Sequence, residues 1–397
     1  MVQNCGVRGT WAYVVTKSFV ALATLFLGAI PFRIESALAT EQGCVEAADL
    51  VRRGVELGDG SSNEQELYQK AKALCPKMAE AHFNLGLALQ RSGKLSEGEQ
   101  ELRESLRLKD DPNFRIGLAG VLLQKGELAL ARGEYNRVID QDGKNVQALQ
   151  GLAVVHEKQK EPEKALEILT KASGINPIDF VTHFNLAALQ EKMGRYDAAI
   201  ESYKRALESR PKHFETLYYL GLLQQKTGSL EDARRSLQSA GELRPEDVKV
   251  HLALAEIFER LGDTTRSEVS LRRVVSLSPQ NLAAHVNLGL LLIETKQFQS
   301  AEESLLKAIA IDPGSSRAAS ALGWAQLELG KLDAAEKNLR NAISLDGTNA
   351  YAHNNLGVLL QRSGRHAAAR AEFQTASRLA PDLLVAQRNF EAVSNAQ

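Results

Sequence analysis

The sequence has few aromatic residues, few cysteines and no excess of charge of either sign. Aromatic side chains make up 6% of its 397 residues, and there are 3 cysteines and 10 prolines. The formal net charge is −1 at pH 7, so the charge balance does not indicate nucleic acid or another polyanion as a partner. Abundant Ala and Leu, with little proline, favour helix.

The sequence also lacks the short motifs that carry common chemistries. It contains no glycine-rich phosphate loop, no G-x-S-x-G elbow, no H-E-x-x-H zinc motif and no C-x-x-C-H haem site. We therefore predict no catalytic residue, no metal site and no cofactor, and we interpret the chain as non-enzymatic.

Long hydrophobic runs are missing except near the N-terminus. Phe19 to Phe32 is an apolar run of 14 residues, which is too short to span a bilayer comfortably. Basic residues precede it, and Ala37-Leu-Ala39 follows it, which is the order of a secretory signal peptide. We predict a signal peptide at 1–39 and an exported mature chain, periplasmic, at the cell surface or secreted, with no membrane span. An uncleaved anchor is the alternative.

Two cysteines remain after this cleavage, because Cys5 lies within the signal peptide. An even pair in an exported protein indicates a disulfide, here between Cys44 and Cys75. Lipidation of Cys44 is the rival interpretation. It needs a Leu-Ala-Gly-type stretch before the cysteine, whereas the sequence there is Glu41-Gln-Gly43.

The prolines reveal an internal period of 34 residues. They recur at Pro177, Pro211, Pro245, Pro279 and Pro313. Such periodicity takes precedence over a domain count from length. The units are 79–111, 112–145, 146–179, 180–213, 214–247, 248–281, 282–315, 316–349 and 350–383.

These units resemble the tetratricopeptide repeat, in which small and large residues alternate at fixed positions. With each unit numbered from 1, position 7 is always Leu, as in Leu85, and position 8 is Gly or Ala. Position 20 is small, and position 24 is Leu, Tyr or Phe. The resemblance covers residues 79–383.

The resemblance implies an all-α, right-handed superhelical solenoid of helix-turn-helix units with a concave groove. Glycine at position 15 suits the end of the first helix, and Lys160 and Lys296 replace it, so we expect strained or differently built turns there. Residues 40–78 are interpreted as an N-terminal cap or degenerate repeat, whose two helices bring Cys44 near Cys75. Residues 384–397 are interpreted as a capping helix with a polar outer face.

The resemblance also places a binding groove on the first helix of each unit, at positions 2, 5, 6, 9, 12 and 13. Asparagine at position 6 can pair with any peptide unit because its amide both donates and accepts. Aromatic residues are candidate anchors, with Trp324 foremost. Basic residues at position 13 form a rail for an acidic or polar segment, broken by Glu294 and Glu328; alternatively they complement the helix dipole. The candidates are Asn84, Asn185, Asn287, Asn355, Trp324, Tyr218, Tyr219, Phe83, Phe184, Lys158, Lys192, Lys226 and Arg260, with Arg91 and Arg362 also on the rail.

Five of the eight histidines occupy position 4 of their units: His82, His183, His251, His285 and His353. They lie a whole repeat or more apart, whereas metal ligands must converge on one ion. We therefore interpret them as packing residues.

The sequence as a whole predicts a protein-interaction scaffold that assembles an envelope or secretion complex, with other proteins as its partners. The alternative is a carrier, or an accessory subunit of a separate enzyme, that handles glycan.

Overall fold

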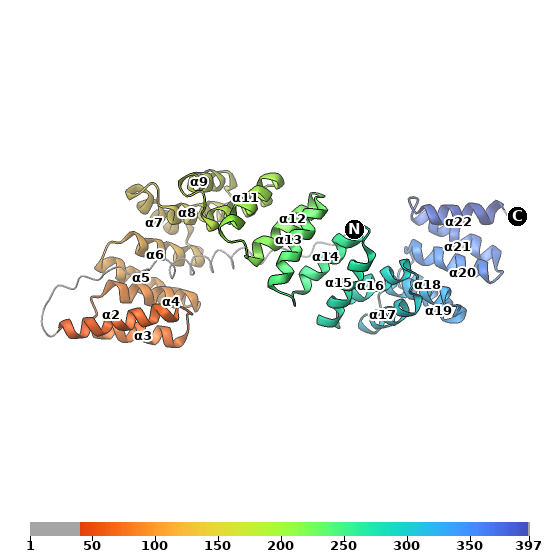
Figure 1. Cartoon of the computed structure of the whole chain (residues 1–397), viewed down its shortest axis with the longest axis horizontal. Helices are drawn as coiled ribbons and strands as arrows, with labels where there is room; N and C mark the ends of the chain where they lie inside the picture. The colour runs from red at the N-terminus through yellow and green to blue at the C-terminus, as the bar shows by residue number, and fades with distance from the viewer. Residues whose placement is uncertain (1–39, 396–397) are drawn as a thin grey trace. The chain divides into compact units, whose positions relative to one another are not determined.

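The computed structural model describes residues 40–395, which fold into helices joined by short turns, with no β-strand in that range. Consecutive helices pack in pairs (Figure 1). The prediction of an all-α fold of serial helix pairs is confirmed. The predicted signal peptide, residues 1–39, lies outside the described residues.

The helices follow one another at short intervals. In chain order they are α2 (Thr40–Leu57), α3 (Ser62–Leu74), α4 (Ala79–Arg91), α5 (Leu95–Leu108), α6 (Pro112–Lys125), α7 (Leu128–Gln141), α8 (Val146–Lys158), α9 (Pro162–Ile175), α10 (Phe180–Lys192), α11 (Tyr196–Ser209), α12 (Phe214–Lys226), α13 (Leu230–Leu243), α14 (Val248–Arg260), α15 (Thr264–Leu277), α16 (Leu282–Glu294), α17 (Phe298–Ile311), α18 (Ser316–Glu328), α19 (Leu332–Leu345), α20 (Ala350–Arg362), α21 (His366–Leu379) and α22 (Leu384–Asn395). No helix of the described chain has the length and apolar character needed to cross a membrane.

The chain divides into two compact units after Pro211, with α2 to α11 in the first and α12 to α22 in the second. Within each unit, the second helix of a pair packs on the first helix of the next, as α5 does on α6 and α17 on α18. The first helices also contact one another, as in α4 with α6, α16 with α18 and α18 with α20. Side chains of successive first helices therefore lie on neighbouring elements.

The turn inside each pair is built from a left-handed residue at position 15. Gly194 has φ 76°, and the following Arg195 N–H donates to the carbonyl of Gln190 at 2.8 Å, which closes the end of α10. Lys160 and Lys296 have φ values of 62° and 60°. Both lysines thus adopt the glycine conformation, and the expectation of strain in these two turns is confirmed.

The helices of a pair pack closely because position 8 is small. A Cβ added to Gly289 would lie 2.5 Å from Cγ of Leu305, the residue at position 24 of the same unit. At position 20, a Cβ on Gly98 would lie 2.9 Å from the carbonyl oxygen of Gly86. The missing side chains are therefore what allows the partner helix and its large residue to fit.

The first pair, α2 and α3, is tied both to itself and to the repeat that follows. A disulfide joins Cys44 to Cys75, with an S–S distance of 2.05 Å and a Cα–Cα distance of 4.9 Å. Ser61 caps α3 by accepting from the Glu64 N–H. The fully buried Glu64 carboxylate pairs with the guanidinium of Arg91, at the end of α4. This ion pair fixes the first helix pair to the second.

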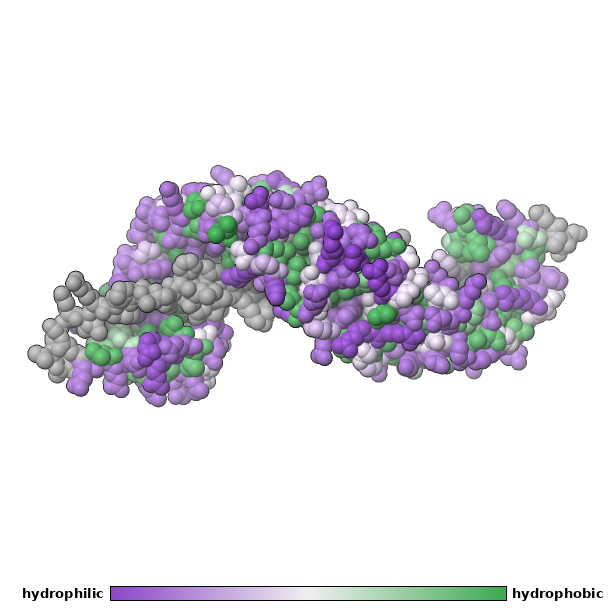
Figure 2. Space-filling model, viewed as in Figure 1, coloured by the Kyte–Doolittle hydropathy of each residue, from purple (hydrophilic) through white to green (hydrophobic). Residues whose placement is uncertain are grey.

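The last helix, α22, packs on α21 and α20 and buries Ala386 and Val393. Its outer side is less polar than expected, since Leu384 and Val385 are exposed by 62% and 47%. Figure 2 shows that hydrophilic residues cover most of the visible face, with hydrophobic ones scattered between them.

Candidate functional site

All the predicted binding residues lie on the first helix of a repeat, at positions 5, 6, 9 and 13. We call the surface formed by these four positions the first-helix face. Residues up to Lys192 belong to the first compact unit, and those from Tyr218 onward belong to the second. The candidates therefore form two separate groups, each on its own set of helices.

The four asparagines at position 6 are held in different ways. The amide nitrogen of Asn84 donates to the carbonyl of Glu80 at 2.8 Å within its own helix. Asn185 is 7% exposed, and its amide nitrogen has no partner among the described residues. Asn287 and Asn355 are half-buried, and Asn355 accepts from a neighbouring asparagine. The structure therefore does not combine them into one row of free amides.

The aromatic candidates of the first unit are core residues. Phe83 is 8% exposed and stacks on Phe114 of the next repeat, with ring centroids 4.6 Å apart. Phe184 is 5% exposed and packs edge-on against Tyr203 at 5.8 Å. The expectation that these two rings are open anchors is corrected, because neighbouring side chains cover their faces.

Tyr218 and Tyr219 of the second unit are half-buried. The Tyr218 ring stacks on Phe214 with centroids 5.9 Å apart, and the guanidinium of Arg244 lies 3.8 Å from the centre of the Phe214 ring. Burial, and to a smaller extent the charge of Asp247, raises the pKa of Tyr218 to about 12. Tyr218 is therefore a neutral hydroxyl at physiological pH.

Trp324 on α18 is half-buried. Its ring packs against a buried cluster that includes Leu327, Leu356 and Leu360, and Val358 packs on the same cluster. Trp324 is thus anchored by its neighbours while part of its surface remains accessible.

The basic residues at position 13 contact the repeat before them rather than forming a free rail. Lys192 pairs with Glu157 at 3.0 Å, and Arg362 pairs with Glu328 at 2.8 Å. Arg260 donates to the carbonyl of Gln225 at 3.1 Å. Arg91 pairs with Glu64, Lys226 is exposed but has a partner, and Lys158 is exposed. Most of these cations therefore tie one repeat to another.

The position-4 histidines share one hydrogen bond. The Nε2 atom of each lies 2.8 to 3.2 Å from the carbonyl oxygen of position 32 in the preceding unit. Because a carbonyl can only accept, each Nε2 carries the hydrogen. His82 and His353 also contact a carboxylate through Nδ1, at 2.6 Å from Glu101 and Glu372. The histidines therefore join the end of one repeat to the start of the next.

These carbonyl and carboxylate partners were not predicted from the sequence. The carboxylates occupy position 23, 19 residues after the histidine. A search for acids 19 residues after each histidine finds both pairs. The hydrogen bond to the backbone carbonyl cannot be found in this way, because every residue type has such a carbonyl.

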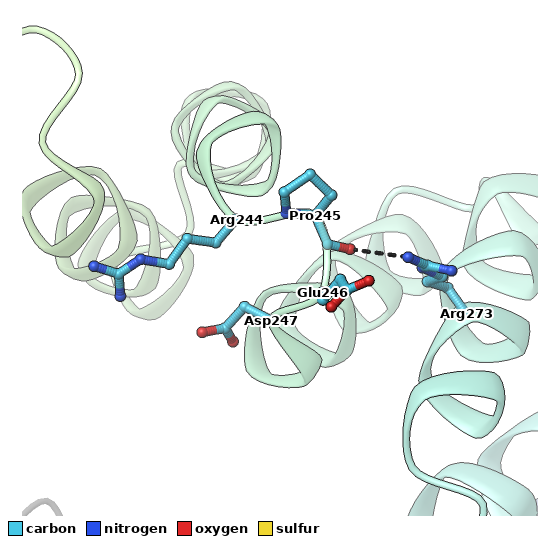
Figure 3. A pocket seen from close by; sticks show the side chains of 5 residues that line it. All are labelled: Arg244, Pro245, Glu246, Asp247 and Arg273. Atoms are coloured by element: carbon cyan, nitrogen blue, oxygen red, sulfur yellow. Dashed lines mark hydrogen bonds between the residues drawn. The ribbon is translucent and has the colours of Figure 1, made fainter.

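A shallow depression lies at the turn between α13 and α14, lined by Arg244, Pro245, Glu246, Asp247 and Arg273. Figure 3 shows the two arginines on opposite sides of it. Arg244 pairs with Glu215 at 2.6 Å, and Arg273 donates to the Pro245 carbonyl at 3.5 Å. The two guanidinium groups serve different partners and do not converge on one ligand position.

No group of three or more metal-ligating side chains comes together in the part of the chain that the structure describes. The first-helix face instead offers partly exposed apolar side chains and single charges. Such a surface can bind a polypeptide segment by burial and pairing.

Comparison with known families finds two models, both described as tetratricopeptide repeat. One matches residues 190–257 and 259–325, and the other matches 83–146, 116–177 and 320–383. The matches extend over most of the described helices.

Two curated relatives are the photosystem I assembly protein Ycf3 of Prochlorococcus marinus strains MIT 9303 and MIT 9313. Each is 28% identical over 87 residues, which is 21% of this chain and 50% of the relative. The chain thus spans about half the length of the curated relatives it matches.

Among solved structures, the chain is similar to MamA, at 26% identity and a TM-score of 0.41, covering 43% of this chain and 93% of MamA. It is also similar to pilF of Pseudomonas aeruginosa, at 20% identity and a TM-score of 0.45, covering 51% of this chain and 92% of pilF.

Proposed function

Because the chain belongs to the tetratricopeptide-repeat family, we propose that it is a non-catalytic scaffold that binds a segment of another protein on its first-helix face. The observation that carries this proposal is at position 9. Leu222, Leu290, Trp324 and Val358 remain only partly buried there, on helices whose other apolar residues are mostly buried. Side chains of this type, repeated at one register, supply apolar contact area for a bound polypeptide.

The finer proposal is an assembly role in an envelope or secretion complex, outside the cytoplasm. The similarity to the photosystem I assembly protein Ycf3 supports an assembly role in general. The order of the N-terminal residues supports export. The alternative of a glycan carrier relies on exposed rings, and the burial of Phe83 and Phe184 reduces their number.

The proposal is tested by affinity capture from the envelope fraction of the source cells, using the intact mature chain. We expect one protein to be retained in stoichiometric amount, and we expect a Trp324→Ala variant to retain less of it. A control variant is Leu306→Ala, which alters a 49%-exposed side chain on the second helix α17. Retention of polysaccharide with no protein would contradict the scaffold function and favour the glycan alternative.

A further inference from the structure

The first-helix face of the second unit contains two acids that oppose helix stability. Glu294 and Glu328 lie in the last turns of α16 and α18, and neither last turn holds a basic residue. Carboxylates near a helix C-terminus interact unfavourably with the helix dipole, which prefers cations there. The presence of glutamate at these two positions is therefore not explained by a contribution to the stability of α16 and α18.

A regular pairing between repeats explains one of the two acids. At position 13, a base from one repeat contacts a group at position 12 or 13 of the repeat before it, as in Lys192 with Glu157 and Arg362 with Glu328. The repeat after Glu294 carries Glu328 at position 13, so it cannot supply a base. In the described chain the exposed Glu294 side chain forms no ion pair or hydrogen bond, and Lys296, two residues further along the chain, does not pair with it.

Apolar side chains lie beside this unpaired acid. Leu290 and Ile293 of α16 are only partly buried against the core, and the same is true of Trp324 on α18. Helix α16 packs on α18. We define these three side chains as the apolar strip: Leu290 and Trp324 occupy position 9 on the two contacting helices, and Ile293 directly precedes Glu294 in the sequence.

We propose that this strip, with Glu294, binds a partner segment in which apolar side chains alternate with lysine or arginine. The partner's cation takes the place that a base from the next repeat occupies elsewhere in the chain, and its apolar side chains cover Leu290, Ile293 and Trp324. Charge complementarity assigns the occupant: an acidic segment would face the unpaired carboxylate of Glu294. This inference rests on the proposed scaffold function and names the chemistry of its partner.

The test uses the intact mature chain and three fluorescein-labelled peptides of equal length, followed by fluorescence anisotropy. The basic peptide alternates Leu with Arg, the acidic peptide has Glu in place of each Arg, and the polar peptide has Ser in place of each Leu. We expect the wild type to prefer the basic peptide, with Glu294→Gln weakening its binding by about fivefold, the effect of one partly exposed ion pair. Glu294→Arg should reverse the preference in favour of the acidic peptide.

Two further variants separate the strip from a general charge effect. Trp324→Ala should weaken the basic peptide by about tenfold or more, as expected for a central aromatic contact. Glu303→Arg changes an exposed acid on α17 that forms no ion pair in the described chain, and it should leave all affinities unchanged. Circular dichroism melts show whether each variant is folded. If Trp324→Ala does not fold, Glu294→Arg alone decides the test.

The proposal is overturned if the acidic peptide binds as tightly as the basic one, if no peptide binds, or if Glu294→Arg has no more effect than Glu303→Arg. The envelope capture experiment separates this result from the scaffold function. If wild type and Glu294→Arg retain the same partner equally, the proposed site at Glu294 is contradicted and the scaffold function is not. Failure of the wild type to retain any protein contradicts the scaffold itself, whatever the peptides show.

Discussion

Lys160 and Lys296 adopt the left-handed backbone that glycine provides in the other first-helix turns. A side chain with a Cβ is disfavoured there by roughly 1–2 kcal/mol, although glycine loses more entropy on folding. Substituting Lys160→Gly should therefore raise the free energy of unfolding by about 0.5–1 kcal/mol, measured by urea denaturation.

The reciprocal change is the control for this prediction. Gly194→Lys places the same strain in the turn of the next repeat, and it should lower stability by a similar amount. If both substitutions move stability in the same direction, the left-handed conformation is not the cause.

Glycine at position 8 makes a different residue-scale prediction. In Gly289→Ala the new Cβ would meet Cγ of Leu305 at 2.5 Å, so the free energy of unfolding should fall by about 1–3 kcal/mol. Gly174→Ala is the matched control, because no atom lies within 4 Å of its Cβ position in α9. That control should be neutral or stabilising, and differential scanning calorimetry of both variants decides the matter.

Residue type predicts the packing positions better than the binding positions. Leu85 could be assigned to the core from its register, because a large apolar residue recurs there. Phe83 shares a helix with it and was expected to be open, but a ring from the next repeat covers it. Whether a first-helix residue is accessible depends on which side chain the next repeat places against it, and register alone does not contain that information.

At the scale of elements, the pair α2 and α3 depends on its disulfide. Replacing both Cys44 and Cys75 by serine should destabilise this pair by about 3 kcal/mol, on the loop-entropy account of crosslinks. Hydrogen exchange should then accelerate in residues 40–74 and remain slow in α16 to α20. Adding dithiothreitol should reproduce the effect in the wild type and change nothing in the double variant. Equal exchange in the two proteins without dithiothreitol would refute the prediction.

The ion pair between Glu336 of α19 and Arg365, which directly precedes α21, predicts that the stability of the folded chain depends on pH. Hydrogen bonds from Arg365, with a smaller contribution from Arg340, lower the pKa of Glu336 to about 2 from its ordinary 4.5. A carboxyl group with a lowered pKa stabilises the folded state above its unfolded pKa, and this stabilisation is lost as pH falls toward the folded pKa. The wild type should therefore lose stability between about pH 4.5 and pH 2.

The comparison for this prediction is Glu336→Gln, which cannot titrate. Its stability, followed by thermal melts across the same pH range, should fall less steeply than that of the wild type. Parallel curves for the two proteins would show that other carboxyl groups determine the acid sensitivity.

The sequence was sufficient to predict the helix pairs, because proline and glycine mark their ends at a fixed interval. It did not show how the pairs are tied together. The row of cations at position 13 could be predicted from the sequence, but the groups that most of them contact belong to the preceding repeat, as Glu157 does for Lys192. The sequence shows that Glu294 interrupts the row of bases at position 13. Only the ion pairs between repeats show that Glu294 itself lacks a partner.

For the whole molecule, export is the main prediction that remains to be tested. The mature protein should begin at Thr40, because cleavage is expected after Ala39. N-terminal sequencing of the protein recovered from an envelope or secreted fraction measures this directly. Recovery of a chain that still begins at Met1 would support an uncleaved anchor instead.

The hydrogen bond between the position-4 histidine and the position-32 carbonyl has a consequence for how the number of repeats can change. Its two halves, the ring at position 4 and the carbonyl at position 32 of the unit before, are only six residues apart in the sequence. Insertion or deletion of a whole 34-residue block at any boundary that carries this histidine leaves each remaining bond complete. Duplication of a repeat within the gene can therefore lengthen the protein, and deletion of a repeat can shorten it, without leaving a histidine ring that lacks its carbonyl partner at the junction.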